Sequence, residues 1–331
     1  MAPPSRVLVL GGAGFIGYHL ARRLAEDGGR EITLVDNLSR GRVDDDLSAL
    51  LERPDVELVR ADLTDPRAWA AFTGAWDQVY MLAAIVGVRN VETDPGRVID
   101  VNTKAVLNLI EWLTPKAGTV FFASTSEAYA GAVSGTLPIP TPEDVPLSVS
   151  AIENPRFAYA ATKILGEAAV IHGARARRMP YVIGRFHNVY GPRMGFDHVV
   201  PELSMRALAR ENPFRVYGPE QRRAFCYVTD AVEAMTRLMT TPKAAGRIVN
   251  IGNDAEEIAI ERLVELVLRL ADFAPTIESR PAPAGSPSRR CPDIARLRAL
   301  TGFAPAIDLE RGVGQTFAWY RDRSGAARST R

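Results

Sequence analysis

A glycine-spaced turn near the start of the chain restricts its possible folds more than any other feature. Gly11, Gly14 and Gly17 follow an apolar run at residues 7–10 and precede a stretch of helical periodicity at residues 18–24. A continuous apolar run is typical of a buried parallel strand, and the glycines let the backbone turn tightly into a helix. The amino terminus of that helix carries a partial positive charge, which favours the binding of an anion. This order of elements predicts a dinucleotide-binding site.

A second apolar run, at residues 32–35, ends at Asp36, whose carboxylate can accept hydrogen bonds from a ribose diol. This placement favours NAD. NADP stays open because Arg40 and Arg42 follow shortly after, and an arginine can hold a 2′-phosphate. Asp62, after a third apolar run, suits either a contact with adenine or the closing of a turn.

Length and charge narrow the expected domains and partners. The 331 residues exceed the usual size of one compact domain, so we expect a large domain with a smaller lobe. A formal net charge of +1 gives no general attraction for nucleic acid. Without a leader-like segment or a long apolar run, we expect a cytoplasmic protein that binds no membrane. Cys226 and Cys291 lack metal-ligand spacing, so no metal site is predicted, and Cys226 is expected to be buried.

Alternation of strand-like and helix-like segments predicts the fold class. Four further apolar runs lie at residues 79–84, 120–123, 181–184 and 248–251. Between them lie helical stretches, among them residues 101–113 and 159–172, whose small and apolar residues suit packing within the chain or across a homodimer interface. We therefore expect an α/β protein with a Rossmann-type, doubly wound parallel sheet.

Proline-rich segments suggest where the smaller, mixed α/β lobe lies. We expect an NAD-binding domain of residues 1–186 and 225–255, and a substrate-covering lobe of residues 187–224 and 256–320. The basic, serine-rich residues 321–331 are predicted to form a flexible tail.

Tyr159 and Lys163 are four residues apart, so on a helix they share one face. A lysine ammonium, together with an oxidised nicotinamide, is expected to lower the pKa of the tyrosine and make it a general base. Ser124, Thr125, Ser126 and Glu127 follow an apolar run, at the strand end where ligands bind in a parallel sheet. Their hydroxyl groups can contact a substrate and Glu127 can act as an acid or base, although such residues also cap turns.

These motifs, with residues 185–193 and 223–228, resemble the extended short-chain dehydrogenase/reductase family of nucleotide-sugar epimerases, dehydratases and decarboxylases. The resemblance implies NAD in the large domain and a nucleoside-diphosphate sugar, with UDP favoured, under the small lobe. The cofactor-binding residues that it implies are Gly11, Gly14, Phe15, Ile16, Gly17, Asp36, Asn37, Asp62, Leu63, Ala83, Tyr159 and Lys163. The substrate-binding residues that it implies are Asn188, Arg193, Arg223 and Arg290. Arginine and amide side chains suit a diphosphate chemically.

The triplet Thr125-Ser126-Glu127 looks most like that of the UDP-glucuronic acid decarboxylases, in which the glutamate and an arginine matching Arg223 assist the reaction. The resemblance implies oxidation at C4, loss of carbon dioxide to a UDP-4-keto-pentose, and reduction to UDP-xylose. A 4-epimerase or a 4,6-dehydratase stays open, although the dehydratases usually carry an aspartate where this chain has Ser126. A non-catalytic NAD-binding module is disfavoured because the pair of Tyr159 and Lys163 is intact.

Overall fold

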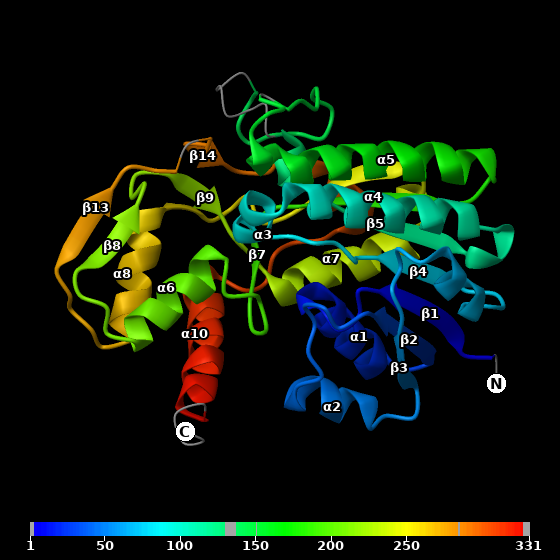
Figure 1. The fold of residues 1–331 in the computed structure, drawn as a ribbon, viewed down its shortest axis with the longest axis horizontal. Coiled ribbons are helices and arrows are strands. Elements are labelled where there is room, and N and C mark those ends of the chain that lie inside the picture. Colours follow the sequence, from blue (N-terminus) through cyan, green and yellow to red (C-terminus); the bar gives the residue numbers. More distant parts are fainter. Residues whose placement is uncertain (1–2, 130–136, 150, 284, 327–331) are drawn as a thin grey trace.

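The computed structural model describes residues 3–129, 137–149, 151–283 and 285–326. Seven parallel strands form the central sheet, in the order β11-β6-β5-β4-β1-β2-β3 (Figure 1). Their bounds are β1 (Ser5–Leu10), β2 (Arg30–Asp36), β3 (Val56–Arg60), β4 (Gln78–Met81), β5 (Thr119–Thr125), β6 (Tyr181–Phe186) and β11 (Arg247–Ile251). The strand order changes direction between β1 and β4, which is where an open parallel sheet binds its ligand. The predicted Rossmann-type fold is confirmed.

Helices cover both faces of the sheet, because successive strand residues point to opposite sides. Val7 and Val9 pack with α1 (Phe15–Asp27) and α7 (Val228–Thr240) on one face. Leu8 and Leu10 pack with α4 (Pro95–Trp112) and α5 (Ala158–Ala176) on the other. Three shorter helices complete this part: α2 (Asp45–Leu51), α3 (Val88–Thr93) and α9 (Ala295–Thr301).

The remaining elements form a smaller lobe beyond the carboxyl ends of the strands, at the left of Figure 1. Its helices are α6 (Val199–Leu208), α8 (Ile260–Leu270) and α10 (Leu309–Ala326). Its strands are β7 (Val189–Tyr190), β8 (Phe214–Tyr217), β9 (Arg222–Ala224), β10 (Cys226–Tyr227), β12 (Glu257–Ala259), β13 (Ile277–Arg280) and β14 (Arg289–Arg290). They form three small sheets, in the orders β12-β9-β14, β10-β7 and β13-β8. Cys226 is buried as predicted.

Three element boundaries differ from those that the sequence suggests. The expected domain bounds also differ at two elements: α9 packs on β11 and α7 of the large part, and β10 pairs with β7 of the small lobe. The run at residues 79–84 leaves the sheet after Met81, because the N–H groups of Leu82 and Ala83 both donate to the Leu10 carbonyl, at 2.9 and 2.8 Å. Helix α4 begins at Pro95, where the Asp94 side chain caps it. Helix α10 continues to Ala326, so the expected tail is helical that far. Residues 327–331 lie outside the described residues. No helix in the described ranges is both long and apolar enough to span a membrane.

Candidate active site

The turn between β1 and α1 fits the diphosphate of NAD. Gly11 has a φ of +89°, and a Cβ on Gly17 would lie 2.2 Å from the Gly11 carbonyl oxygen. Only glycine avoids this clash, so the loop can close tightly. Helix α1 begins without a side-chain cap and has no acidic residue in its first turn. Its amino-terminal N–H groups are therefore free to bind an anion.

The carboxylate of Asp36 lies at the end of β2, beside this turn. It accepts hydrogen bonds from the N–H groups of Ala13 at 3.2 Å and Leu38 at 2.9 Å. Burial raises the pKa of Asp36, and these two bonds oppose the rise. At Asp62, the hydrogen bond from the Thr64 N–H instead lowers the pKa. Both carboxylates border the same cavity, as the ribose and adenine of NAD require.

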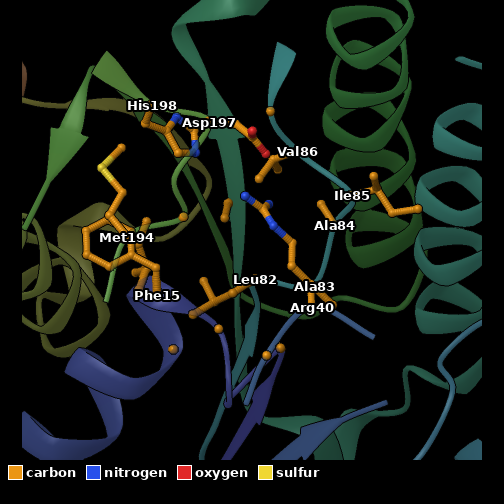
Figure 2. Close-up of a pocket in the computed structure, with 18 of the residues that line it drawn as sticks. Phe15, Arg40, Leu82, Ala83, Ala84, Ile85, Val86, Met194, Asp197 and His198 are labelled. Atoms are coloured by element: carbon orange, nitrogen blue, oxygen red, sulfur yellow. The ribbon is translucent and has the colours of Figure 1, made fainter. Parts of the chain in front are cut away.

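A single cavity of about 1070 Å³ brings the predicted residues together between the sheet and the small lobe (Figure 2). Every residue that the sequence analysis assigned to cofactor, catalysis or substrate lines it, except Arg223. Phe15 and Ala83 lie on the sheet side, and Met194 and His198 face them from the loop after β7. The cavity can therefore hold a dinucleotide and a second ligand side by side.

Tyr159 and Lys163 both lie in the first turns of α5. The Lys163 ammonium donates to the Ala123 carbonyl at 2.8 Å and lies 5.8 Å from the centre of the Tyr159 ring. Burial lowers the pKa of Lys163 to about 8. Burial and the charge of Glu127 raise the pKa of Tyr159, while a hydrogen bond with Thr125 and the charge of Arg40 oppose the rise. The groups of this chain alone raise the pKa of Tyr159, so the predicted lowering depends on the oxidised nicotinamide and stays a prediction.

Glu127 follows β5 and forms an ion pair with Arg290 of β14, at 2.7 Å. Burial would raise the pKa of Glu127, but the charges of Arg290, Arg156 and Arg223 outweigh it and lower the pKa. The carboxylate is therefore ionised at neutral pH. Because β14 belongs to the small lobe, this ion pair connects the two parts of the chain across the cavity.

The predicted substrate-binding residues have different surroundings. The Asn188 amide donates to the Ala224 carbonyl at 2.8 Å, and Arg193 pairs with Asp44 at 2.9 Å. Arg223 donates to the side chains of Gln221, at 2.9 Å, and Ser286, at 3.3 Å. Burial and the neighbouring Arg290 lower the pKa of Arg223 to about 10. The roles of these residues toward a substrate stay predictions.

A buried polar network behind β5 escaped the sequence reasoning. Arg185 of β6 makes two hydrogen bonds to Glu167 of α5, at 2.8 and 2.6 Å. Glu167 also accepts from Ser124, and Arg185 donates to the Tyr129 hydroxyl at 2.8 Å. His187, near this network, is buried, and burial lowers its pKa to about 3, so it is neutral. The network fixes β5 and α5, which carry the catalytic candidates.

Five arginines that the sequence reasoning did not assign to catalysis or substrate also line the cavity, among them Arg40 and Arg156. Arg156 precedes Tyr159 by three residues, in a short 3₁₀ helix at Pro155–Phe157. Its position next to the tyrosine motif is a signal that could have identified it. Arg40 was considered only as a ligand for a 2′-phosphate.

Comparison with known proteins assigns the family. Residues 7–252 match the model of the NAD dependent epimerase/dehydratase family. A UDP-N-acetyl-alpha-D-glucosaminuronate decarboxylase of Bacillus cytotoxicus is 31% identical over 96% of this chain and 98% of its own. UDP-glucuronic acid decarboxylase 1 of Arabidopsis thaliana is 32% identical over 96% of this chain and 70% of its own.

Solved structures agree with this assignment. The UDP-glucose 4-epimerase of Thermotoga maritima, solved with UDP-glucose, superimposes with a TM-score of 0.83 at 27% identity, covering 96% of this chain and 99% of its own. The glycine turn and Asp36 fit NAD, the cofactor of this group. The chain therefore belongs to the NAD dependent epimerase/dehydratase family of extended short-chain dehydrogenases/reductases.

Proposed function

We propose that this protein is an NAD-dependent decarboxylase of UDP-glucuronic acid, which it converts through a 4-keto intermediate to UDP-xylose. The observation that carries the proposal is the ionised Glu127, held by Arg290 within the cavity that contains Tyr159. The curated relatives named above as decarboxylases of uronic acid nucleotides support it.

Tyr159 removes the proton from the C4 hydroxyl and returns it when the product alcohol forms. Gly11, Gly14, Gly17 and Asp36 would hold NAD, which would supply a hydride acceptor and donor for C4 and a positive charge that favours the Tyr159 phenolate. Thr125, which interacts with the Tyr159 hydroxyl, orients that oxygen toward the sugar. Lys163, fixed on the Ala123 carbonyl, adds positive charge on the same face of α5.

The resulting ketone is beta to the C5 carboxylate, so the bond between C5 and C6 can break. Carbon dioxide leaves, and the electron pair forms an enolate whose charge lies on the C4 oxygen. Donors that surround this oxygen lower the barrier. A solvent proton, delivered beside Glu127 and its arginine neighbours, then adds to C5, and reduction at C4 completes the pentose.

The direct test is to incubate the purified protein with UDP-glucuronic acid and to follow carbon dioxide, NADH absorbance and sugar products by mass and NMR. Formation of UDP-xylose or its 4-keto precursor is expected. Because the Bacillus cytotoxicus relative is named for the 2-acetamido sugar, UDP-N-acetylglucosaminuronic acid is the second substrate to test. Release of no carbon dioxide from either compound would refute the proposal.

Glu127→Gln tests the assigned residue. The variant should keep its bound NAD and lose most of the carbon dioxide release, because the neutral amide removes the charge that pairs with Arg290 beside the reacting sugar. Glu52→Gln, an exposed position at the end of α2, is the matched control. Unchanged carbon dioxide release in Glu127→Gln would remove Glu127 from the mechanism.

A 4-epimerase is the second candidate, because the structural similarity extends to the Thermotoga maritima epimerase. In that reaction the ketone rotates before reduction and no carbon is lost. The same incubation distinguishes the two, since an epimerase yields a product of unchanged mass with an inverted C4.

A further inference from the structure

Seven arginines line the cavity, and they differ in whether a carboxylate of the chain already neutralises them. Arg193 pairs with Asp44, Arg290 with Glu127 and Arg323 with Asp46, at 2.9, 2.7 and 2.7 Å. The other four have no carboxylate oxygen within 4.0 Å in the part of the chain that the structure describes: Arg40, Arg42, Arg89 and Arg156. These four are available to an anionic ligand.

Of these four, Arg40 reaches far into the cavity. Its side chain extends from the loop after β2 toward Val86 and the loop that carries Asp197 (Figure 2). A Cβ placed on Gly195 would lie 2.8 Å from the Arg40 Nη2 atom, and one on Gly87 would lie 3.8 Å from it. The guanidinium thus occupies a space between two loops that glycines leave open.

The loop that carries Arg40 is fixed on its outer side by the small lobe. Arg193 donates to the Asp44 carboxylate at 2.9 Å and to the Arg42 carbonyl at 3.2 Å. Trp319 and Arg323 of α10 donate to Asp46 at 3.1 and 2.7 Å. These contacts hold the Arg42 carbonyl, which is two residues beyond Arg40, and the start of α2. Arg40 is therefore anchored before a ligand arrives, which reduces the entropy lost on binding.

The guanidinium is also close to the catalytic tyrosine. The charge of Arg40 opposes the rise in the pKa of Tyr159, an effect that requires proximity in the shared cavity. Its own pKa is lowered by burial, against the charges of Asp197 and Tyr159. In the proposed reaction Tyr159 contacts the C4 hydroxyl, and the carboxylate of a uronate is attached to the next ring carbon, C5. A uronate carboxylate is therefore one ring carbon away from the atom that Tyr159 contacts, in the cavity that Arg40 shares with Tyr159.

We propose that Arg40 binds the carboxylate of the reacting sugar and so selects uronate nucleotides over neutral hexose nucleotides. This inference rests on the proposed function. A guanidinium suits the role because its planar donors match the two oxygens of a carboxylate. Arg40 is then a specificity residue, and the proton transfer at C4 stays with Tyr159.

The chemistry fixes which kinetic constant Arg40 controls. The ion pair forms with the bound substrate and disappears as the carboxylate becomes carbon dioxide. Such an interaction stabilises the ground state at least as much as the transition state, so its loss raises KM without lowering kcat. From the usual contribution of a hydrogen bond to a charged group, Arg40→Met should raise KM for the uronate by roughly 10- to 100-fold.

The experiment measures binding of UDP-glucuronic acid and UDP-glucose to the NAD-loaded protein by calorimetry, with steady-state carbon dioxide release beside it. Arg40→Met should weaken binding of the uronate by that factor and leave binding of UDP-glucose within about 2-fold of the original. Arg40→Lys should restore part of the preference. Arg247→Met, at the exposed opposite end of β11, is the matched control and should change neither affinity.

Three outcomes would overturn the inference. Equal weakening for both sugars would mean that Arg40 has no preference for the carboxylate. Loss of bound NAD with an unchanged sugar preference would assign the guanidinium to the dinucleotide diphosphate. A folded Arg40→Lys variant with no uronate preference would exclude simple charge recognition. If the original protein releases no carbon dioxide, the proposed function fails, while the ratio of the two affinities still decides the role of Arg40.

Discussion

Glu167→Gln should lower the free energy of unfolding by about 3 kcal/mol, because it leaves the charge of Arg185 buried without its counter-ion. The two side chains are only 3% and 4% exposed, and two hydrogen bonds at 2.8 and 2.6 Å join them. Removing one partner of a buried ion pair lowers the free energy of unfolding by about 3–5 kcal/mol. The lower end applies, because glutamine keeps one acceptor and Arg185 keeps its bonds to Tyr129 and to the Glu143 carbonyl.

Urea unfolding followed by circular dichroism measures this loss. Glu26→Gln is the control, since its ion pair with Arg22 is similarly short, with one hydrogen bond at 2.7 Å, but has side chains 54% and 56% exposed. That variant should lose less than about 0.5 kcal/mol. Glu167→Leu combined with Arg185→Met should recover much of the loss, because it removes both charges. A loss below about 1 kcal/mol in Glu167→Gln would refute the claim that the pair is desolvated.

Three further outcomes follow from the structure. Gly17→Ala should abolish copurification of NAD, measured by absorbance after denaturation, because its Cβ would meet the Gly11 carbonyl oxygen at 2.2 Å; retained NAD would contradict the assigned seat. Burial lowers the pKa of Lys163 from 10.5 to about 8, so between these values the unfolded chain holds the extra proton and stability rises with pH. Urea midpoints at pH 8 and pH 10 should show this rise, and Lys163→Met should lack that contribution. Leu107 of α4 and Leu165 of α5 are 45% and 48% exposed, so we expect them to pack in a homodimer, and glutamate at both should give a monomer in sedimentation velocity.

The sheet and the cofactor seat were predictable because each depends on a local pattern. The apolar run before Gly11 and the acid at Asp36 specify their own surroundings, and the sheet places them together. The carboxyl ends of parallel strands meet at one edge, so Glu127 and Tyr159 were also expected to share a cavity.

What escaped prediction depends on contacts between distant segments. The partner of Glu127 is 163 residues away at Arg290, and no local pattern assigns that pair. Lys163 was expected to act on Tyr159 because the two share a helix face, but the nearer Ala123 carbonyl belongs to another element. The buried pair of Glu167 and Arg185 looks like ordinary surface charge in the sequence.

Helix α10 offers a way to modify this enzyme without changing the glycine turn or Asp36. Trp319 and Arg323 donate hydrogen bonds to Asp46 at the start of α2. A truncation, fusion or mutation in α10 therefore removes contacts that hold the loop after β2. That loop borders the dinucleotide seat. Directed evolution aimed only at residues 309–326 should therefore yield variants with altered cofactor retention, each with the glycine turn and Asp36 intact.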